Sequence, residues 1–176
     1  MIRRNLHFAP QSVKCKAYQA SVRPILEYAS SCWQPTSMKK NQRLEMVQHN
    51  AAKFVANKYP KKGHYNEFSI SQILNDLSWE SLEERRNKAR ATTAYKILND
   101  KLILPPDLLP LANPLKQTRL TDQVRVGPNF HLLEPHARLN IVNKTFFYSA
   151  PRTWNTLVSP EQATAPSADS FKKYFC

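Results

Sequence analysis

The placement of proline constrains the fold of this chain more than any other feature. Pro24, Pro35 and Pro60 interrupt or end segments whose apolar residues repeat at helical spacing. Because proline lacks an N–H and clashes with the preceding turn, a helix does not run undisturbed through these positions. Only two glycines are present, which disfavours a fold built on tight hairpins. The sequence therefore predicts a mainly α fold made of helices of limited length.

The N-terminal part predicts an antiparallel pair of helical segments. Ser12 is a suitable N-cap, and the apolar line that follows is expected to break at about residues 21–23, ahead of a short helix over residues 24–31. Ser37 is a suitable cap for the next helix, which is expected to end before Pro60. The apolar stripe of that helix consists of Leu44, Val47, Ala51, Phe54 and Val55.

The middle of the chain predicts two more helices, over residues 69–77 and from Ser81 to about Asn99. Ser81 and Glu84 match the capping box, in which the two side chains satisfy free backbone N–H groups. The long helix is expected to bury a narrow side made of Leu82, Ala89, Thr93, Ile97 and Leu98. Its outer face is expected to carry Arg85, Arg86, Lys88 and Arg90.

The C-terminal part is less regular. The dense prolines of residues 101–122 predict an extended linker or a wrapped loop. Residues 123–126 and 145–148 lean toward β structure and could form one short β-hairpin. A helix is expected to start within residues 149–155, and a short terminal helix is expected over residues 167–175.

Positive charge is distributed unevenly over the four parts that these patterns predict. The parts are a basic helical part (1–62), a helical middle packed on it (63–100), the Pro-rich linker or loop (101–122) and a small irregular and helical part (123–176). The formal net charge is +13, and residues 1–62 hold twelve Lys and Arg against two acidic residues. Concentrated positive charge favours a polyanion through counterion release. The alternative is a generic basic surface that keeps the protein soluble.

Ordered motifs give the chain a family resemblance. They are Lys16-Ala17-Tyr18 followed by VRPILEYASSCWQP (22–35), LEMVQHNAAKFV (44–55), Leu77 with WESLEERR (79–86), FFYSAPRTWN (146–155) and SFK (170–172). Together they resemble the thumb and downstream region of jockey-like LINE (non-LTR retrotransposon) reverse transcriptases. The chain departs from the family pattern at Asn50, because a basic residue is usual near that position.

The resemblance implies that this chain does not polymerise DNA by itself. In the family, the catalytic carboxylates lie on palm strands upstream of the matched region. Two-metal nucleotidyl transfer needs closely placed aspartates, and no two aspartates of this chain are adjacent. The five aspartates are Asp76, Asp100, Asp107, Asp122 and Asp169. The implied partners are the palm domain of a longer chain and the backbone of an RNA–DNA or DNA duplex.

Basic residues carry the strongest functional prediction. Arg and Lys suit phosphate groups, and no base-reading motif is visible, so contact with a nucleic acid is expected to be largely independent of its sequence. The predicted phosphate contacts are Lys39, Lys40, Arg43 and Lys53. They belong to a wider basic set that also includes Arg3, Arg4, Lys14, Lys16, Arg23, Lys58, Lys61 and Lys62.

Several other side chains have more ordinary interpretations. Tyr18, Tyr28 and Trp33 are expected to pack between the first helices, although stacking on nucleic-acid bases is an alternative. Arg23 is a motif residue that could equally pair with Glu27 one turn on. Trp79 and Trp154 are expected to anchor helix starts onto the core.

Other classes of protein and site are disfavoured. Cys15, Cys32 and Cys176 form a poor disulfide framework, which favours a reducing compartment, cytoplasm or nucleus. Cysteine and histidine do not cluster, and His131 and His136 are five residues apart, so no metal or cofactor is predicted. No apolar run approaches the ~18 residues of a membrane span.

Three functional hypotheses follow. The first is a non-catalytic fragment of a retrotransposon RNA-directed DNA polymerase that binds template–primer nucleic acid through a basic helical surface. The second is a truncated or repurposed structural or interaction protein with no nucleic-acid role. The third, an independent enzyme, lacks a catalytic constellation in the sequence.

Overall fold

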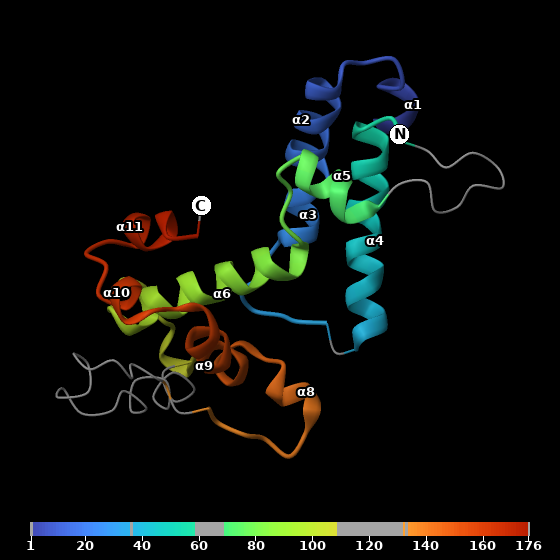
Figure 1. Cartoon of the computed structure of the whole chain (residues 1–176). Helices are drawn as coiled ribbons and strands as arrows, with labels where there is room; N and C mark the ends of the chain where they lie inside the picture. The colour runs from blue at the N-terminus through green and yellow to red at the C-terminus, as the bar shows by residue number, and fades with distance from the viewer. Residues whose placement is uncertain (1, 36, 59–68, 109–131, 133, 176) are drawn as a thin grey trace. The chain divides into compact units, whose positions relative to one another are not determined.

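The fold of the chain is mainly α. A computed structural model describes residues 2–35, 37–58, 69–108, 132 and 134–175, and every regular element within them is a helix. Figure 1 shows these elements in chain order. They are α1 (Ile2–Asn5), α2 (Gln11–Ser21), α3 (Arg23–Glu27), α4 (Met38–Val55), α5 (Ile70–Asp76), α6 (Leu82–Leu98), the short 3₁₀ helix η1 (Pro106–Leu108), α8 (Asn140–Asn143), α9 (Phe146–Leu157), α10 (Pro160–Ala163) and α11 (Ala168–Lys173).

The chain divides into two compact units. The first comprises Met1–Tyr28 and Ser37–Arg85, and the second comprises Ala29–Thr36 and Arg86–Cys176. The long helix α6 therefore supplies its first turn to the first unit and its remaining length to the second. The part boundaries predicted at 62/63 and 122/123 lie outside the described residues.

The first unit is built on the predicted antiparallel pair. Helix α4 packs against α2 and α5, and Figure 1 shows α2 and α4 running in opposite directions. The predicted break occurs at Val22, but α3 ends at Glu27 rather than at residue 31. One cause is Ala29, whose φ of 50° is left-handed and incompatible with a continuing helix. The core of this unit consists of Tyr18, Ala52, Val55, Ile73 and Trp79.

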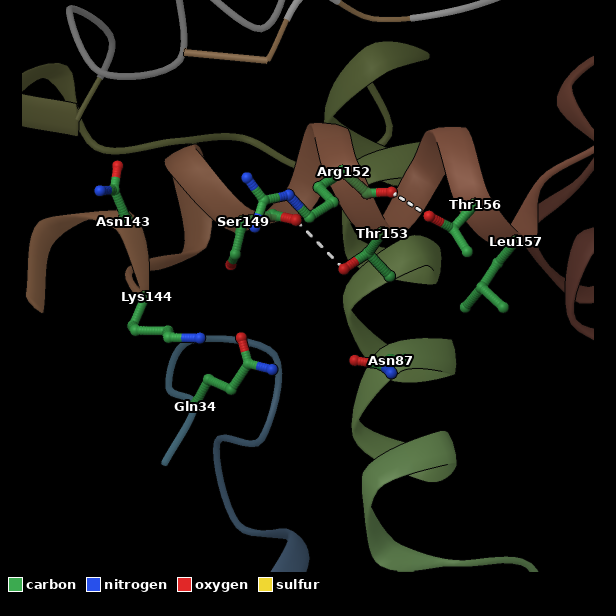
Figure 2. Close-up of a pocket in the computed structure, with 9 residues that line it drawn as sticks. All are labelled: Gln34, Asn87, Asn143, Lys144, Ser149, Arg152, Thr153, Thr156 and Leu157. Carbon is green, nitrogen blue, oxygen red and sulfur yellow. Dashed lines mark hydrogen bonds between the residues drawn. The ribbon is translucent and has the colours of Figure 1, made fainter. Parts of the chain in front are cut away.

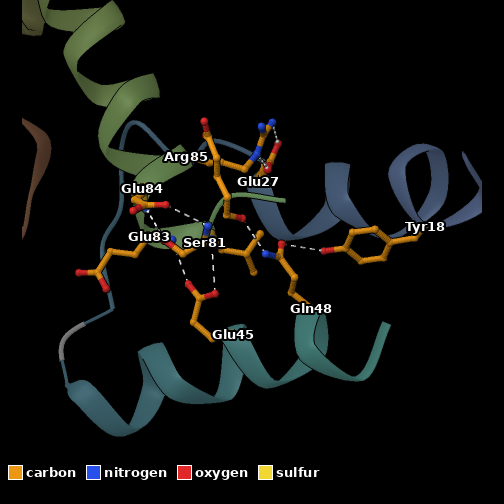
Figure 3. A network of polar contacts seen from close by, with 10 residues as sticks. Tyr18, Glu27, Glu45, Gln48, Ser81, Glu83, Glu84 and Arg85 are labelled. Atoms are coloured by element: carbon orange, nitrogen blue, oxygen red, sulfur yellow. Dashed lines mark hydrogen bonds and ion pairs between the residues drawn. The ribbon is translucent and has the colours of Figure 1, made fainter. Parts of the chain in front are cut away.

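The start of α6 is fixed by two sets of side-chain caps, drawn in Figure 3. The predicted capping box is present: Ser81 Oγ accepts from the Glu84 N–H, and Glu84 Oε2 accepts from the Ser81 N–H, each at 3.1 Å. Glu45 reaches across from α4 and accepts the next two backbone N–H groups, those of Leu82 at 3.2 Å and Glu83 at 2.9 Å. A carboxylate at this position also complements the positive end of the helix dipole. Glu45 thereby joins α4 to the first turn of α6.

Replacing Glu45 with alanine is expected to lower the free energy of unfolding by about 1–3 kcal/mol, because two helix N–H groups lose a charged acceptor. Urea unfolding followed by circular dichroism measures this change. The matched control is Gln42→Ala, which truncates an exposed side chain of the same helix. Equal stabilities for the two variants would contradict the capping role of Glu45.

The second unit packs aromatic side chains between α6, α9 and α11. Phe171 stacks on Tyr95 with ring centroids 4.5 Å apart and on Trp154 at 5.9 Å. The Tyr95 hydroxyl donates to the carbonyl of Ala165, and Lys88 Nζ donates to the carbonyl of Phe175 at 2.7 Å. Trp154 is buried as predicted, but it lies near the end of α9 rather than at a helix start. These contacts dock the short helix α11 onto α6.

Two arginines that the sequence placed on the outer face of α6 are instead buried. Arg86 is 2% exposed and Arg90 is 1% exposed. Arg90 donates to the Trp33 carbonyl at 3.2 Å and to Asn87 Oδ1 at 3.1 Å, while the Arg86 guanidinium lies 5.7 Å from the centre of the Trp33 ring. Burial, and after it the charge of Arg86, lowers the pKa of Arg90. The prediction was wrong because a carbonyl and a ring from residues 29–36 make an interior position favourable for these side chains.

The β structure expected at residues 145–148 is also wrong. Thr145 is the N-cap residue of α9, and residues 146–148 form the first turn of that helix. Phe146, Ala150 and Trp154 recur at intervals of four and are all buried, so they form the buried face of a helix rather than alternating along a strand. The proposed partner strand at 123–126 lies outside the described residues.

Candidate nucleic-acid interface

Helix α4 carries all four predicted phosphate contacts. Lys39, Arg43 and Lys53 are separated by four and ten residues, which correspond to roughly one and three helical turns. These three side chains therefore share one side of α4, named here the α4 basic face. Lys39 and Arg43 are exposed and Lys53 is half-buried. Lys40 is also exposed, but it projects about 100° around the helix from Lys39.

The opposite side of α4 explains why the basic face points outward. Its buried residues include Gln48, Ala52 and Val55. Gln48 accepts a hydrogen bond from the Tyr18 hydroxyl at 3.1 Å (Figure 3) and donates to the Glu80 carbonyl at 2.7 Å. Both contacts come from segments at least 30 residues away in the sequence. They fix the rotation of α4 about its own axis.

The buried side of α4 is rotated from the predicted apolar stripe. Val47, a predicted stripe member, is 41% exposed, whereas Gln48 is 1% exposed. Sequence reasoning missed Gln48 because an uncharged polar residue beside an apolar stripe is usually solvated. The available signal was its position one turn from Ala52 and two turns from Val55, which places it on their side of the helix.

Arg23 has a different partner from the one considered in the sequence. Its guanidinium lies 5.9 Å from the ring centres of both Tyr18 and Trp79, and these two rings stack at 4.5 Å. Glu27 instead pairs with Arg85, which donates through Nε and, at 3.1 Å, through Nη2 (Figure 3). This two-point pair raises the pKa of Arg85. Burial raises the pKa of Tyr18 to about 12, so its hydroxyl stays protonated as the donor to Gln48.

The wider basic set is only partly available for a polyanion. Lys14 is buried, donates to Asn57 Oδ1 at 2.6 Å and lies 4.9 Å from the centre of the Phe54 ring. Lys58 forms an ion pair with Asp76 at 3.3 Å. Lys61 and Lys62 lie outside the described residues. The exposed members of the set are Arg3, Arg4, Lys16 and, on α4, Lys39, Lys40 and Arg43.

The three aromatic residues predicted to pack between the first helices have three different positions. Tyr18 is 3% exposed and belongs to the core, as predicted. Tyr28 is 79% exposed, so its predicted burial is wrong. Trp33 is half-buried and belongs to the second unit, where Arg86 and Arg90 contact it. None of the three lies on α4, so the α4 basic face consists of charge without a stacking platform.

Histidine and metal-binding groups add little to this surface. Burial lowers the pKa of His49, which favours its neutral form. Among the residues with defined placement, no three His, Cys, Asp or Glu side chains gather as metal ligands would. Over the same residues, no helix is both long and apolar enough to cross a membrane.

Comparison with known proteins adds no relative. No protein-family model, curated protein or solved structure matches the chain. The similarity to LINE reverse transcriptases therefore rests on the sequence motifs alone and stays a prediction.

Proposed function

We propose that the chain binds the phosphate backbone of a nucleic-acid duplex through the α4 basic face. The observation that carries this proposal is that the charged side chains on that face are all positive. Lys39, Arg43 and Lys53 all lie there, while the only acid of α4, Glu45, is turned away and caps α6. No carboxylate on α4 thus competes with a phosphate for these cations.

The spacing of the cations suits a backbone rather than a small anion. Lys39 and Lys53 are fourteen residues apart, or about 21 Å of helix rise. At about 3.4 Å per nucleotide, that length spans roughly six phosphates of one strand. The interaction would be independent of base sequence, because the face presents charge but no arrangement for reading base edges.

In a longer chain, the same surface would hold the template–primer duplex beside a catalytic palm. This role extends the sequence resemblance to LINE reverse transcriptases and assigns no catalysis to the chain itself. Support comes from α4, which contains the motif region 44–55 and carries Lys39, Arg43 and Lys53 on one side.

Fluorescence anisotropy with RNA–DNA hybrids of two unrelated sequences tests the proposal. The affinity is expected to be equal for both sequences. The logarithm of the binding constant should fall with the logarithm of the salt concentration, with a slope at least as steep as about −2.7, which corresponds to three phosphate contacts. A folded chain without measurable binding at ~50 mM salt would overturn the proposal. A strong preference for one sequence would also contradict it.

Asn50 provides a gain-of-function prediction. It is exposed and lies between Arg43 and Lys53, seven residues after the first and three before the second, on the same side of α4. Asn50→Lys is expected to raise affinity by roughly eightfold at ~0.1 M salt and to steepen the salt slope by about 0.9, because it adds one phosphate contact. The control is Gln19→Lys, which adds the same charge at an exposed position of α2. Equal gains from both variants would contradict a specific role for the α4 basic face.

One observation favours the alternative of a protein-interaction role. Ile25 and Tyr28 lie three residues apart at and just after α3, and they are 75% and 79% exposed. Exposed large apolar side chains close together are typical of protein contact surfaces. If Ile25→Ser together with Tyr28→Ser weakens self-association in sedimentation experiments while the chain shows no nucleic-acid binding, this alternative is favoured.

A further inference from the structure

A polar cavity lies within the second unit, and none of its lining residues belongs to α4. Its volume is about 210 Å³, below the ~300–1,000 Å³ of pockets for drug-sized ligands. Figure 2 shows the cavity between the polar side of α9, Asn87 of α6 and the segment that carries Gln34. The size fits one small polar molecule rather than a large cofactor.

The charged groups of the cavity favour an anion. Lys144 and Arg152 line it, and none of its nine lining residues is acidic. Arg152 Nε donates to Glu134 Oε2 at 3.2 Å, whereas the Lys144 ammonium makes no ion pair within the described part of the chain. Figure 2 shows the Lys144 side chain extending toward Gln34. A phosphate group at this end would meet a cation and an amide donor.

The buried Arg90 fixes the orientation of Asn87, one of the residues that line the cavity. Arg90 donates to Asn87 Oδ1 at 3.1 Å, so the NH₂ group of Asn87 is the part left to act as a donor. The positive charges of Arg90 and Arg86 are buried one turn apart on the same helix. Charge of this kind in a low-dielectric interior adds to the attraction for an anion nearby.

The hydroxyl side chains of α9 that line the cavity offer hydrogen-bond acceptors rather than donors. Ser149 donates to the Thr145 carbonyl at 2.8 Å, Thr153 to the Ser149 carbonyl at 3.1 Å and Thr156 to the Arg152 carbonyl at 2.8 Å. Each hydroxyl thus gives its only proton to the backbone and keeps lone pairs as acceptors. Figure 2 shows two of these bonds along the wall. A ligand that fills the cavity therefore needs hydroxyl donors as well as an anionic group.

We propose that this cavity binds the ribose–phosphate unit of a single ribonucleotide. The phosphate lies by Lys144 and Gln34, and the ribose hydroxyls donate to Thr153 and Thr156. A 2′-hydroxyl both donates and accepts, which distinguishes RNA sugars from DNA sugars at such a wall. The site belongs to the second unit and is independent of the proposed backbone contacts on α4.

Isothermal titration calorimetry and amide chemical-shift mapping on the full chain test this site with ribose 5-phosphate, 2-deoxyribose 5-phosphate, inorganic phosphate and adenosine monophosphate as probes. Ribose 5-phosphate is expected to bind and to shift the amides of residues 143–157. The 2-deoxy compound and inorganic phosphate are expected to bind roughly tenfold more weakly, the loss typical of one or two hydrogen bonds. Adenosine monophosphate binding more weakly than ribose 5-phosphate would restrict the site to free sugar phosphates and overturn its assignment to a ribonucleotide.

Two variants locate the interaction. Lys144→Gln is expected to weaken every phosphate probe by about tenfold or more, because it removes a charge-assisted bond. Thr153→Val is expected to abolish the preference for ribose over 2-deoxyribose while leaving the affinity for inorganic phosphate unchanged. The control is Lys173→Gln, an exposed cation outside the cavity, which should change nothing.

The proposal is overturned if folded chain does not bind ribose 5-phosphate at ~10 mM, or if Lys144→Gln and Lys173→Gln behave alike. Neutralising Lys39, Arg43 and Lys53 should leave this binding intact. Failure of the α4 proposal and failure of the cavity proposal are therefore separate outcomes.

Discussion

Changing Lys39, Arg43 and Lys53 together to glutamine should weaken binding to an RNA–DNA hybrid by roughly 500-fold at ~0.1 M salt. Each lost phosphate contact removes about 0.9 from the salt exponent, so the log–log slope should become shallower by about 2.7. The physical reason is that cations on one exposed face release counterions together when they meet a phosphate backbone. Anisotropy titrations between ~50 and ~200 mM salt measure both the affinity and the slope.

A second triple variant distinguishes the effect of the α4 basic face from the effect of net charge. Lys96, Arg138 and Lys173 all belong to the second unit, and changing them to glutamine removes the same three positive charges. This control should shift affinity only a few-fold, because none of the three cations belongs to the α4 basic face and salt at ~0.1 M screens attraction that is not direct contact. If both triple variants lose affinity equally, binding depends on net charge alone and the α4 basic face has no special role.

Replacing Phe171 with alanine should have the largest effect on folding, a loss of about 3–5 kcal/mol in the free energy of unfolding. Phe171 is fully buried and its ring stacks on both Tyr95 and Trp154. Its helix, α11, has only six residues, too few to be stable without packing. The expected result is that α11 detaches and that the core of the second unit is no longer closely packed.

Hydrogen exchange read by mass spectrometry distinguishes this outcome from general destabilisation. Exchange in Phe171→Ala should rise first in residues 168–175 and in the facing turns of α6, and urea unfolding should shift to lower concentrations. Tyr174→Ala is the matched control, because it truncates an aromatic ring that is 52% exposed, three residues further along. A Phe171→Ala protein as stable as Tyr174→Ala would show that the stacked rings do not hold the second unit together.

Local sequence signals predicted several helix boundaries, although the predicted cap Ser12 lies inside α2, which begins at Gln11 after the N-cap Pro10. Ser37 caps α4, Ser81 and Glu84 form the capping box of α6, and the break before Pro24 falls at Val22. Caps and proline breaks act over three or four residues, so their consequences are visible in the sequence itself. The same holds for the mainly α class, which follows from apolar spacing and scarce glycine.

The candidate interface was partly predictable for a related reason. Lys39, Arg43 and Lys53 share a side of α4 because of helical spacing alone, which is a local property. Which side of α4 is buried was not predictable in detail. It depends on Gln48, whose partners on Tyr18 and Glu80 lie 30 and 32 residues away.

By itself, then, the sequence determined the mainly α class, the side-chain caps of α4 and α6, the break at Val22 and the concentration of positive charge near the N-terminus. Only the tertiary structure decided which charges remain on the surface. Lys14, Arg86 and Arg90 looked like solvated cations, yet each is at most 2% exposed. Their long side chains are buried because distant segments supply an amide oxygen, a carbonyl or an aromatic ring. Burial of a charge depends on such long-range partners, and periodicity along one helix carries no information about them.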